Sequence, residues 1–514
     1  MIRTIEQYVE SLRDGRVLYH LGEKVKDATT HPVLQRVVWL GAIDWALTND
    51  PETRNMYVTK DADGEDINLL WTQPRNQEEL LRKREAYVEG ARLGGMGCHS
   101  MGVDALASST VVAKRIDKAK GTNYSEHVEA YRKYLQKTDI GITGAQTDVK
   151  GDRHLHANAQ VQHKDFYVRI VDKQKDGIIV SGAKYHISFT PASNEAIFLP
   201  CRAHGEEDAA HAVVFAAPLN AKGITCISAE PEVRSQRTAE TDWESPWASK
   251  EAEVGGGECM IVLDNVFVPW ERIFMCGEWE FSRDMARTFG TFHRLFACSR
   301  MVSFMEIMTG AGALMAEYNG LETYPHIRSK MAYLAQVTET LKIVSKAACM
   351  FPVPEPGTDW VNPEPMYTNI AKYIYASNFP EVCKTVQDIA GGIAADPISY
   401  RDWMNPEEQP YIEKYLAGKA GVPTEHRLRA IRLVTDLTGG KHITLNIHAE
   451  GSLATQEMMF HAIADWELYK SSAKKLAGIP GWENHPFVGK MKDFSGVIDS
   501  KMPPVDKSYI SYRE

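Results

Sequence analysis

The sequence has no CxxC pair, no long apolar run and no excess of basic charge. Its eight cysteines are scattered along 514 residues, a pattern typical of buried thiols rather than of a disulfide framework or a zinc site. A transmembrane helix needs about 18 or more consecutive apolar residues, whereas the longest apolar stretches, such as "HAVVFAAPL", have the length of strands. The opening residues lack the apolar run of a signal peptide. We therefore expect a cytoplasmic protein without disulfides.

The charge balance and the missing nucleotide motifs argue against further classes of protein. A net charge of −10 argues against nucleic-acid binding, which needs clustered Lys and Arg on the surface. The glycine-rich "GGMGCHSMG" follows a predicted helix rather than a strand, so it does not meet the context of a dinucleotide-binding fingerprint. GxSxG, HExxH and zinc-ligand spacings are also missing. The chain is thus not expected to bind NAD(P)H in the usual way, and small-molecule chemistry stays compatible with its composition.

Hydrophobic periodicity divides the chain into three predicted parts. Residues 1–140 are expected to be mostly helical, because apolar residues recur at helical spacing. Residues 141–278 change to a period of two around turns such as "DKQKDG", which predicts a β-domain of about six to eight strands. Residues 279–514 return to long amphipathic patterns and predict a helical bundle. A β-domain between two helical parts creates a crevice, and domain junctions commonly bind cofactors.

Three segments contain residue types that suit a functional site. Cys98 lies in the "GGMGCHSMG" segment, which fits either a tight helix–helix junction or a loop close to a flat ligand. His293 stands near the start of a predicted bundle helix, where a buried structural histidine and a catalytic base are both compatible with the pattern. "NIHAEGSLATQ" places Gly451 and Ser452 at a helix N-terminus beside Glu450. That arrangement fits simple capping or an amide-lined site for a phosphate or a ring carbonyl.

Several motifs resemble those of the 4-hydroxyphenylacetate 3-hydroxylase oxygenase family and follow the family's order. They are "QYVESLRDGRVLYHLGEKVKDATTHP", "GDRH", "DGIIVSGAKYHIS", "LDNVFVPWERIF" and "HAEGS". The resemblance implies an α+β fold like that of acyl-CoA dehydrogenases, with an N-terminal helical domain, a central antiparallel β-barrel-like domain and a C-terminal four-helix bundle. It also implies a homo-oligomer, normally a tetramer, that binds FAD between the β-domain and the bundle.

The resemblance covers two branches with different chemistry. One branch hydroxylates phenols with O2 and with FADH2 that a separate NAD(P)H:flavin reductase supplies. The other is similar to 4-hydroxybutyryl-CoA dehydratase/vinylacetyl-CoA isomerase and adds a [4Fe–4S] cluster held by three Cys and one His. The segment "GITGAQTDVKGDR" looks more like the dehydratase branch.

The residues at the positions of the cluster ligands favour the phenol-hydroxylating branch instead. An ungapped comparison with the dehydratase branch keeps His293 but puts Met96, Ser100 and Arg300 where the cluster cysteines belong. Because thiolates hold such a cluster, we expect no iron–sulfur cluster and no other metal. A shift of the comparison would let Cys98 and Cys298 take the place of two ligands, and this alternative stays open.

The pattern of the phenol branch is incomplete as well. Where 4-hydroxyphenylacetate hydroxylases place an Arg, a Tyr and a His around the phenol, this chain has Cys98, Gly102 and Gly144. We therefore expect a substrate other than 4-hydroxyphenylacetate, or one bound differently.

The resemblance implies an FADH2-dependent monooxygenase, the oxygenase component of a two-component system. A flavin C4a-hydroperoxide would transfer oxygen to a small phenolic or aromatic substrate. His293 is the first candidate for the base and His186 the second, since an unperturbed histidine pKa of about 6.5 suits that role. Ser188 matches a family Ser/Thr that faces the reactive edge of the flavin, and Cys98 completes the catalytic candidates. A lyase of the dehydratase type is the alternative.

The cofactor residues implied by the resemblance come from three segments and Ser188. Residues 144–147 would follow the pyrimidine side of the flavin, residues 150–153 would meet the ribityl or phosphate part, and residues 449–452 would cap the dinucleotide from a neighbouring subunit. An ordinary salt bridge is the other explanation for Arg153. The residues assigned to FAD are Gly144, Ala145, Gln146, Thr147, Lys150, Gly151, Asp152, Arg153, Ser188, Ala449, Glu450, Gly451 and Ser452.

Overall fold

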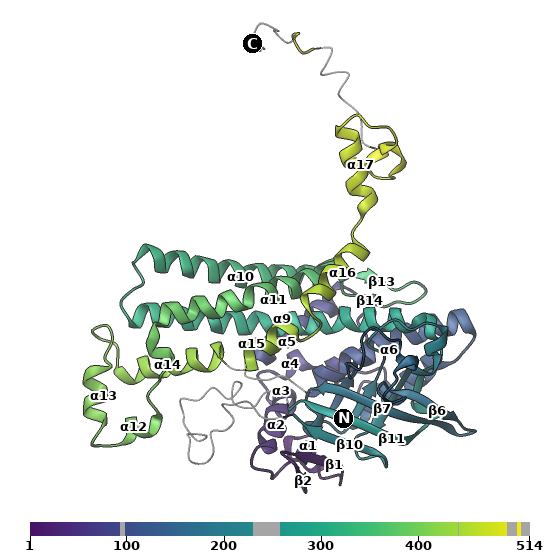
Figure 1. The fold of residues 1–514 in the computed structure, drawn as a ribbon, viewed down its shortest axis with the longest axis horizontal. Helices are drawn as coiled ribbons and strands as arrows, with labels where there is room; N and C mark the ends of the chain where they lie inside the picture. Colours follow the sequence, from purple (N-terminus) through teal and green to yellow (C-terminus); the bar gives the residue numbers. More distant parts are fainter. Residues whose placement is uncertain (93–97, 230–256, 440, 491–500, 505–514) are drawn as a thin grey trace. The chain divides into compact units, whose positions relative to one another are not determined.

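The computed structural model describes residues 1–92, 98–229, 257–439, 441–490 and 501–504 (Figure 1). The chain divides into two units, residues 1–456 and residues 457–514. Across the described ranges, no helix combines the length and the apolar character needed to cross a membrane.

The first unit begins with helices. Thr4 caps the first of them in a capping box: Gln7 N donates to Thr4 Oγ1 at 3.3 Å, and Thr4 N donates to Gln7 Oε1 at 3.0 Å. The helices of this part are α1 (Ile5–Ser11), α2 (Leu34–Gly41), α3 (Ile43–Asn49), α4 (Arg54–Tyr57), α5 (Gln77–Arg92), α6 (Cys98–Lys120) and α7 (Tyr124–Thr138).

Two sheets form the centre of the first unit. The larger has the order β2 (Glu23–Val25), β1 (Val17–His20), β10 (Ile224–Ser228), β11 (Cys259–Pro269), β7 (Gly177–Ile187) and β6 (Arg169–Lys173). The smaller has the order β12 (Ile273–Cys276), β9 (Val213–Pro218), β8 (Glu195–Phe198) and β5 (Ile142–Ala145). Most neighbours pair antiparallel, but β1 pairs with β10 and β5 pairs with β8 in parallel. Two short ladders, β3 (Val58–Lys60) with β4 (Asp66–Asn68) and β13 (Val353–Pro354) with β14 (Val361–Asn362), lie apart from these sheets.

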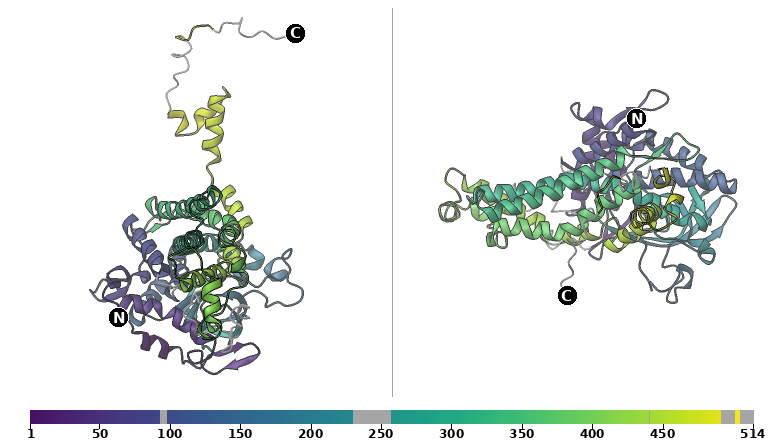
Figure 2. Two further views of the ribbon diagram at one scale, coloured as in Figure 1. Left: turned by 90° about the vertical axis from the view of Figure 1, so that its left-hand side faces the viewer. Right: turned by 90° about the horizontal axis from the view of Figure 1, so that it is seen from above.

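Four long helices form the C-terminal bundle of the first unit. They are α9 (Ser282–Tyr318), α10 (Pro325–Met350), α11 (Pro365–Ala390) and α14 (Thr424–Thr438). Figures 1 and 2 show α9, α10 and α11 side by side, and Met305, Leu341 and Phe379 are among the residues of their apolar core. The shorter helices are α12 (Tyr400–Met404), α13 (Gln409–Tyr415) and α15 (Lys441–His448). The predicted α+β class, with N-terminal helices, central sheets and a C-terminal helical bundle, is confirmed.

The second unit contains α17 (Trp466–Leu476), which Asp465 caps by accepting a hydrogen bond from Leu468 N at 2.8 Å. Helix α16 (Leu453–Ile463) spans the boundary between the units.

Helix α6 joins the β-sheets to the bundle, because it packs on both β5 and α9. The contact with β5 depends on two glycines. A Cβ on Gly102 would lie 2.1 Å from Ile142 Cγ1, and a Cβ on Gly144 would lie 2.9 Å from the carbonyl oxygen of Met101. Gly102 and Gly144 are two of the three positions that differ from the phenol hydroxylases. Both allow close packing between helix and strand.

Candidate functional site

A histidine–aspartate pair lies at the junction of α6 and α9. His293 Nδ1 is 2.9 Å from Asp104 Oδ2, and Asp104 is buried while His293 is partly exposed. Burial raises the pKa of Asp104, and the hydrogen bond to His293 opposes that rise. With Nδ1 directed to the carboxylate, Nε2 is the ring nitrogen that remains to exchange a proton with a ligand.

Aromatic rings fix the orientation of His293. Phe289, one helical turn earlier on α9, stacks on the imidazole with ring centroids 4.9 Å apart and an interplanar angle of 27°. The Phe289 ring also lies 3.4 Å from the position that a Cβ on Gly144 would occupy. Strand β5 and His293 therefore contact the same aromatic ring, which brings the predicted residues Gly144 and His293 into one neighbourhood.

Ser188 reaches this neighbourhood from the end of β7. Its carbonyl oxygen accepts a hydrogen bond of 2.8 Å from Thr143 Oγ1, and Thr143 directly precedes Gly144 on β5. His186 has a different setting. It is exposed on β7 with a φ of 60°, and its ring lies 4.1 Å from that of Tyr185. His293, the first of the two predicted bases, is held by a buried carboxylate.

A buried lysine holds the segment that follows β5. Lys184 Nζ donates to the carbonyl oxygens of Gln146 at 2.9 Å and Leu199 at 2.7 Å, and to Asp148 Oδ1 at 2.6 Å. The backbone of Thr147 is fixed too, since its carbonyl accepts from Tyr185 N at 3.0 Å. Ala145 is buried on β5, and the side chains of residues 146 and 147 are half-buried.

Residues 150–153 form an exposed loop fixed through its backbone. Gln160 Oε1 accepts from Asp152 N at 2.9 Å, and the same oxygen lies 2.5 Å from where a Cβ on Gly151 would stand. Gly151 adopts a φ of 51°, which glycine tolerates best. The side chains of Lys150 and Arg153 are exposed, and neither forms an ion pair with a residue in the described ranges.

The turn at residues 449–452 lies beside α9 of the same chain. Arg294, next to His293, donates through Nε to the carbonyl oxygen of Glu450 at 3.4 Å. Glu450 and Gly451 adopt φ values of 56° and 101°, and Gln456 Nε2 donates to the Gly451 carbonyl at 3.0 Å. The turn therefore borders the His293 neighbourhood from the bundle side. Ala449 is half-buried in it, and Ser452 Oγ is 3.1 Å from Thr455 Oγ1.

Family models match the chain along most of its length. The model described as "4-hydroxyphenylacetate 3-hydroxylase N terminal" matches residues 4–275, and the corresponding C-terminal model matches residues 282–478. The chain belongs to the 4-hydroxyphenylacetate 3-hydroxylase family. The family resemblance found in the motifs is thus confirmed.

Relatives from both branches of the family are similar to this chain. It is 30% identical to a 4-hydroxybutyryl-CoA dehydratase/vinylacetyl-CoA-Delta-isomerase of Clostridium aminobutyricum, over 93% of this chain and 100% of the relative. It is 27% identical to a 4-hydroxyphenylacetate 3-monooxygenase oxygenase component of Thermus thermophilus, over 85% and 89%. The structure of an oxygen-tolerant archaeal 4-hydroxybutyryl-CoA dehydratase from N. maritimus superposes with a TM-score of 0.86 at 30% identity, covering 94% and 96% of the chains. A 4-hydroxyphenylacetate 3-monooxygenase oxygenase component complexed with FAD, 24% identical, shares the fold with a TM-score of 0.82 and covers 92% and 98%.

Among the described residues, Arg300 stands at one of the positions expected for a cluster cysteine, and it does not fit an iron–sulfur cluster. Arg300 is buried where the family comparison expects a cysteine, and burial raises the pKa of the nearby Cys298 thiol to about 12, which disfavours the thiolate. Met96 and the side chains of Cys98 and Ser100 lie outside the described residues. Within the described ranges, only His156, Glu207 and Asp208 form a group of three close metal-ligand side chains, and none of them is a predicted cluster ligand.

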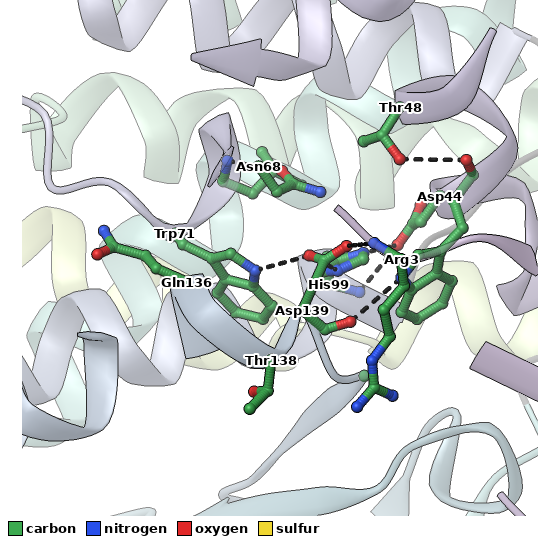
Figure 3. Close-up of polar contacts among 12 residues, drawn as sticks. Arg3, Asp44, Thr48, Asn68, Trp71, His99, Gln136, Thr138 and Asp139 are labelled. Carbon is green, nitrogen blue, oxygen red and sulfur yellow. Dashed lines mark hydrogen bonds and ion pairs between the residues drawn. The ribbon is translucent and has the colours of Figure 1, made fainter. Parts of the chain in front are cut away.

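A buried charged network holds the start of α6, and the sequence did not reveal it (Figure 3). His99 lies between two carboxylates, with Nδ1 3.1 Å from Asp44 Oδ2 and Nε2 3.0 Å from Asp139 Oδ1. Trp71 Nε1 donates to the same Asp139 oxygen at 3.1 Å, and Arg3 N donates to the other at 3.1 Å. Burial alone would lower the pKa of His99, but the two carboxylates outweigh burial and raise it to about 9. His99 is therefore a charged anchor that fixes the helix from which Asp104 projects.

Proposed function

We propose that this chain is an FAD-dependent monooxygenase of its family that hydroxylates a small, phenolic or aromatic substrate without an iron–sulfur cluster. The observation that carries the proposal is the His293–Asp104 pair at the junction of sheet and bundle, with Arg300 in place of a cluster thiolate. Residue chemistry at the site outweighs overall similarity here, because relatives on one fold differ in reaction through their site residues.

The side chains present fit FAD. The half-buried amide of Gln146 and hydroxyl of Thr147 supply hydrogen-bonding groups for a flavin ring, and the exposed cations of Lys150 and Arg153 suit a diphosphate. When bound in reduced form, FAD would supply the two electrons of the overall reaction, in which substrate, O2 and FADH2 give hydroxylated product, water and FAD. Residues 449–452 would approach the cofactor from the bundle side.

His293 would act as the general base for the substrate hydroxyl. Its Nε2 accepts the phenol proton, which increases the electron density of the ring that is hydroxylated. Asp104 keeps the imidazole in the tautomer with the proton on Nδ1 and stabilises the positive charge that His293 gains. Phe289 stacks on the imidazole and restricts its rotation, and Ser188 would border the space toward the cofactor.

The partners are proposed from what the chain lacks. Because the sequence has no fingerprint for NAD(P)H, a separate NAD(P)H:flavin reductase would deliver FADH2 by diffusion. A homo-oligomer, tetrameric as the family resemblance implies, would complete the assembly. Besides FADH2, the ligands would be the phenolic substrate and O2.

The proposal is tested by single-turnover reactions with chemically reduced FAD. Protein loaded anaerobically with FADH2 is mixed with oxygenated buffer and a panel of phenols, and hydroxylated product and hydrogen peroxide are both quantified. We expect at least one phenol to give product in near-stoichiometric yield per FADH2, with little peroxide, because a protected site suppresses unproductive oxidation. Peroxide without product across the panel would reject hydroxylation of phenols.

A dehydratase/isomerase acting on 4-hydroxybutyryl-CoA is the second candidate, and overall similarity supports it better than the first. Identity and TM-score are both higher for the dehydratases than for the monooxygenases. The two candidates differ in requirements. Conversion of 4-hydroxybutyryl-CoA by anaerobically purified protein, without reductant or O2, would establish the second candidate. Iron and acid-labile sulfide in that protein would show that another set of ligands replaces the missing thiolates.

Lys184→Met is expected to weaken FAD binding about 10- to 100-fold, because the loss of its charge-assisted hydrogen bonds frees the backbone segment that would contact the flavin. The substitution removes the bond that holds the backbone of Gln146. It also removes the nearest cation of Asp148, which keeps a contact of 3.9 Å with Arg202 Nε. Binding is measured by titration of flavin fluorescence, and Lys175→Met, an exposed lysine in the β6–β7 turn, is the matched control. Equal affinities of the two variants would show that Lys184 does not position the cofactor segment.

A further inference from the structure

Three cations are buried together in the bundle beside the His293 neighbourhood. Arg294 and Arg300 on α9 and Lys372 on α11 are 5%, 6% and 1% exposed. Glu450 pairs with one of them, with Oε2 3.7 Å from Lys372 Nζ. Even when Arg294 is left out of the count, the ion pairs of the described residues give one carboxylate to the two cations Arg300 and Lys372. Buried charges normally have partners, because an uncompensated one costs several kcal/mol.

Arg300 has no counter-ion among the described residues. Its Nε is buried without a hydrogen-bond partner, and it forms no ion pair with residues in the described part of the chain. Burial lowers the pKa of Lys372; Glu450 opposes this effect, and the two arginines reinforce it. The cluster therefore carries a positive charge that the described residues do not neutralise.

Further polar atoms in the cluster lack partners. Asn446, whose carbonyl accepts from Lys372 Nζ at 3.1 Å, has a buried Nδ2 without a hydrogen bond within the described ranges. The side-chain oxygens of Asn369 and Gln456 are also buried without a hydrogen-bond partner within the described ranges. Asn369 Nδ2, in contrast, donates to the backbone carbonyl of Gln456 at 2.9 Å. Buried polar atoms are almost always satisfied by protein, water or ligand. Several such atoms near Lys372, together with an unpaired guanidinium whose charge acts on the same lysine, indicate a place where a polar ligand group is bound.

We propose that Arg300, Lys372 and Asn446 form a buried subsite for an oxyanion. The ligand group is a carboxylate or a phosphate, since a guanidinium binds the oxygens of either group in a planar, bidentate way. It has two possible sources: a carboxylate on the aromatic substrate or the diphosphate of FAD. Arg294 connects the subsite to the catalytic pair, because it is adjacent to His293 in sequence and donates to the Glu450 carbonyl. The assignment of the substrate source rests on the proposed function, whereas the subsite itself does not.

The test compares two pairs of ligands, and in each pair one member carries an oxyanion group that the other lacks. Binding of 4-hydroxybenzoate and of 4-hydroxybenzyl alcohol to the FAD-loaded protein is measured by calorimetry, and binding of FAD and of riboflavin to the cofactor-free protein by fluorescence. A substrate-carboxylate subsite predicts that Arg300→Met weakens 4-hydroxybenzoate binding about 10- to 100-fold and leaves the other three unchanged. A diphosphate subsite predicts the same loss for FAD and none for riboflavin. These binding measurements need no turnover, so they are independent of whether hydroxylation occurs.

Two controls separate this role from a structural one. Arg283→Met removes an exposed arginine from the same helix and should change none of the four affinities. Arg300→Met should raise the melting temperature of the ligand-free protein, because it removes an unpaired buried charge, whereas loss of a structural contact would lower it. Arg300→Gln replaces it in the same test if the methionine variant does not fold. Unchanged affinities for all four ligands, or a lower melting temperature with uniform losses, would overturn the proposal.

Discussion

His293→Gln is expected to reduce hydroxylation about 100- to 10,000-fold, the range over which a positioned general base accelerates a reaction. The variant should still bind FADH2 and consume O2, so that hydrogen peroxide replaces the product. The reason is local: in the proposed mechanism Nε2 accepts the substrate proton, while Nδ1 is directed to Asp104. Product and peroxide are measured in the same single turnover, and His163→Gln, an exposed histidine of the β-domain, is the control.

Asp104→Asn is also expected to reduce the rate of hydroxylation, and this variant keeps His293 itself. An asparagine retains the shape of the side chain, but its amide can donate to Nδ1 and so favours the tautomer with the proton on Nε2. That tautomer cannot accept a proton from the substrate, so the rate should fall even though the histidine is still present. An unchanged rate of product formation in both variants would mean that the pair at the α6–α9 junction is structural.

The fold was predictable where each element carries its own periodic signal. The turn expected around "DKQKDG" joins β6 and β7, which pair antiparallel with Arg169 opposite Ser181. The long bundle helices were likewise visible from their spacing. Strands β1 and β2 were not, because they have only four and three residues. Val17 pairs with Thr225, a partner that local sequence does not reveal.

In the candidate site, too, the sequence identified single residues but not the residues that contact them in the fold. The sequence identified His293, Gly144 and Ser188, which the fold brings together. It did not identify Asp104 and Phe289, which hold His293, or Lys184, which holds the backbone of Gln146. Asp104 and Lys184 each lie within a mostly apolar stretch, and an isolated charge on a buried face is the signal that points to such positioning roles. The sequence ranked His293 before His186, but the carboxylate that holds His293 depends on a tertiary contact.

His99→Gln is expected to lower the free energy of unfolding by about 3–5 kcal/mol, the cost of breaking a buried ion pair by removing one partner. Asp44 and Asp139 would remain buried after the loss of the cation between them. Urea unfolding followed by tryptophan fluorescence suits the measurement, since Trp45 and Trp71 pack against His99. The exposed His163→Gln again serves as the control and should change stability little.

The pH dependence of the free energy of unfolding distinguishes a charged His99 from a neutral His99 that stabilises the fold by packing alone. The folded pKa of His99 is raised to about 9, above the unfolded value of about 6.5, so the folded state holds a proton that the unfolded state releases in this window. The contribution of His99 is therefore fully present below about pH 6.5 and is lost as pH rises through about 9, with a slope of up to about 1.4 kcal/mol per pH unit. His99→Gln should remove this slope while His163→Gln retains it. If the parent protein and His99→Gln show parallel curves from pH 6.5 to 9, His99 is neutral in the folded protein, and the two carboxylates must be balanced in another way.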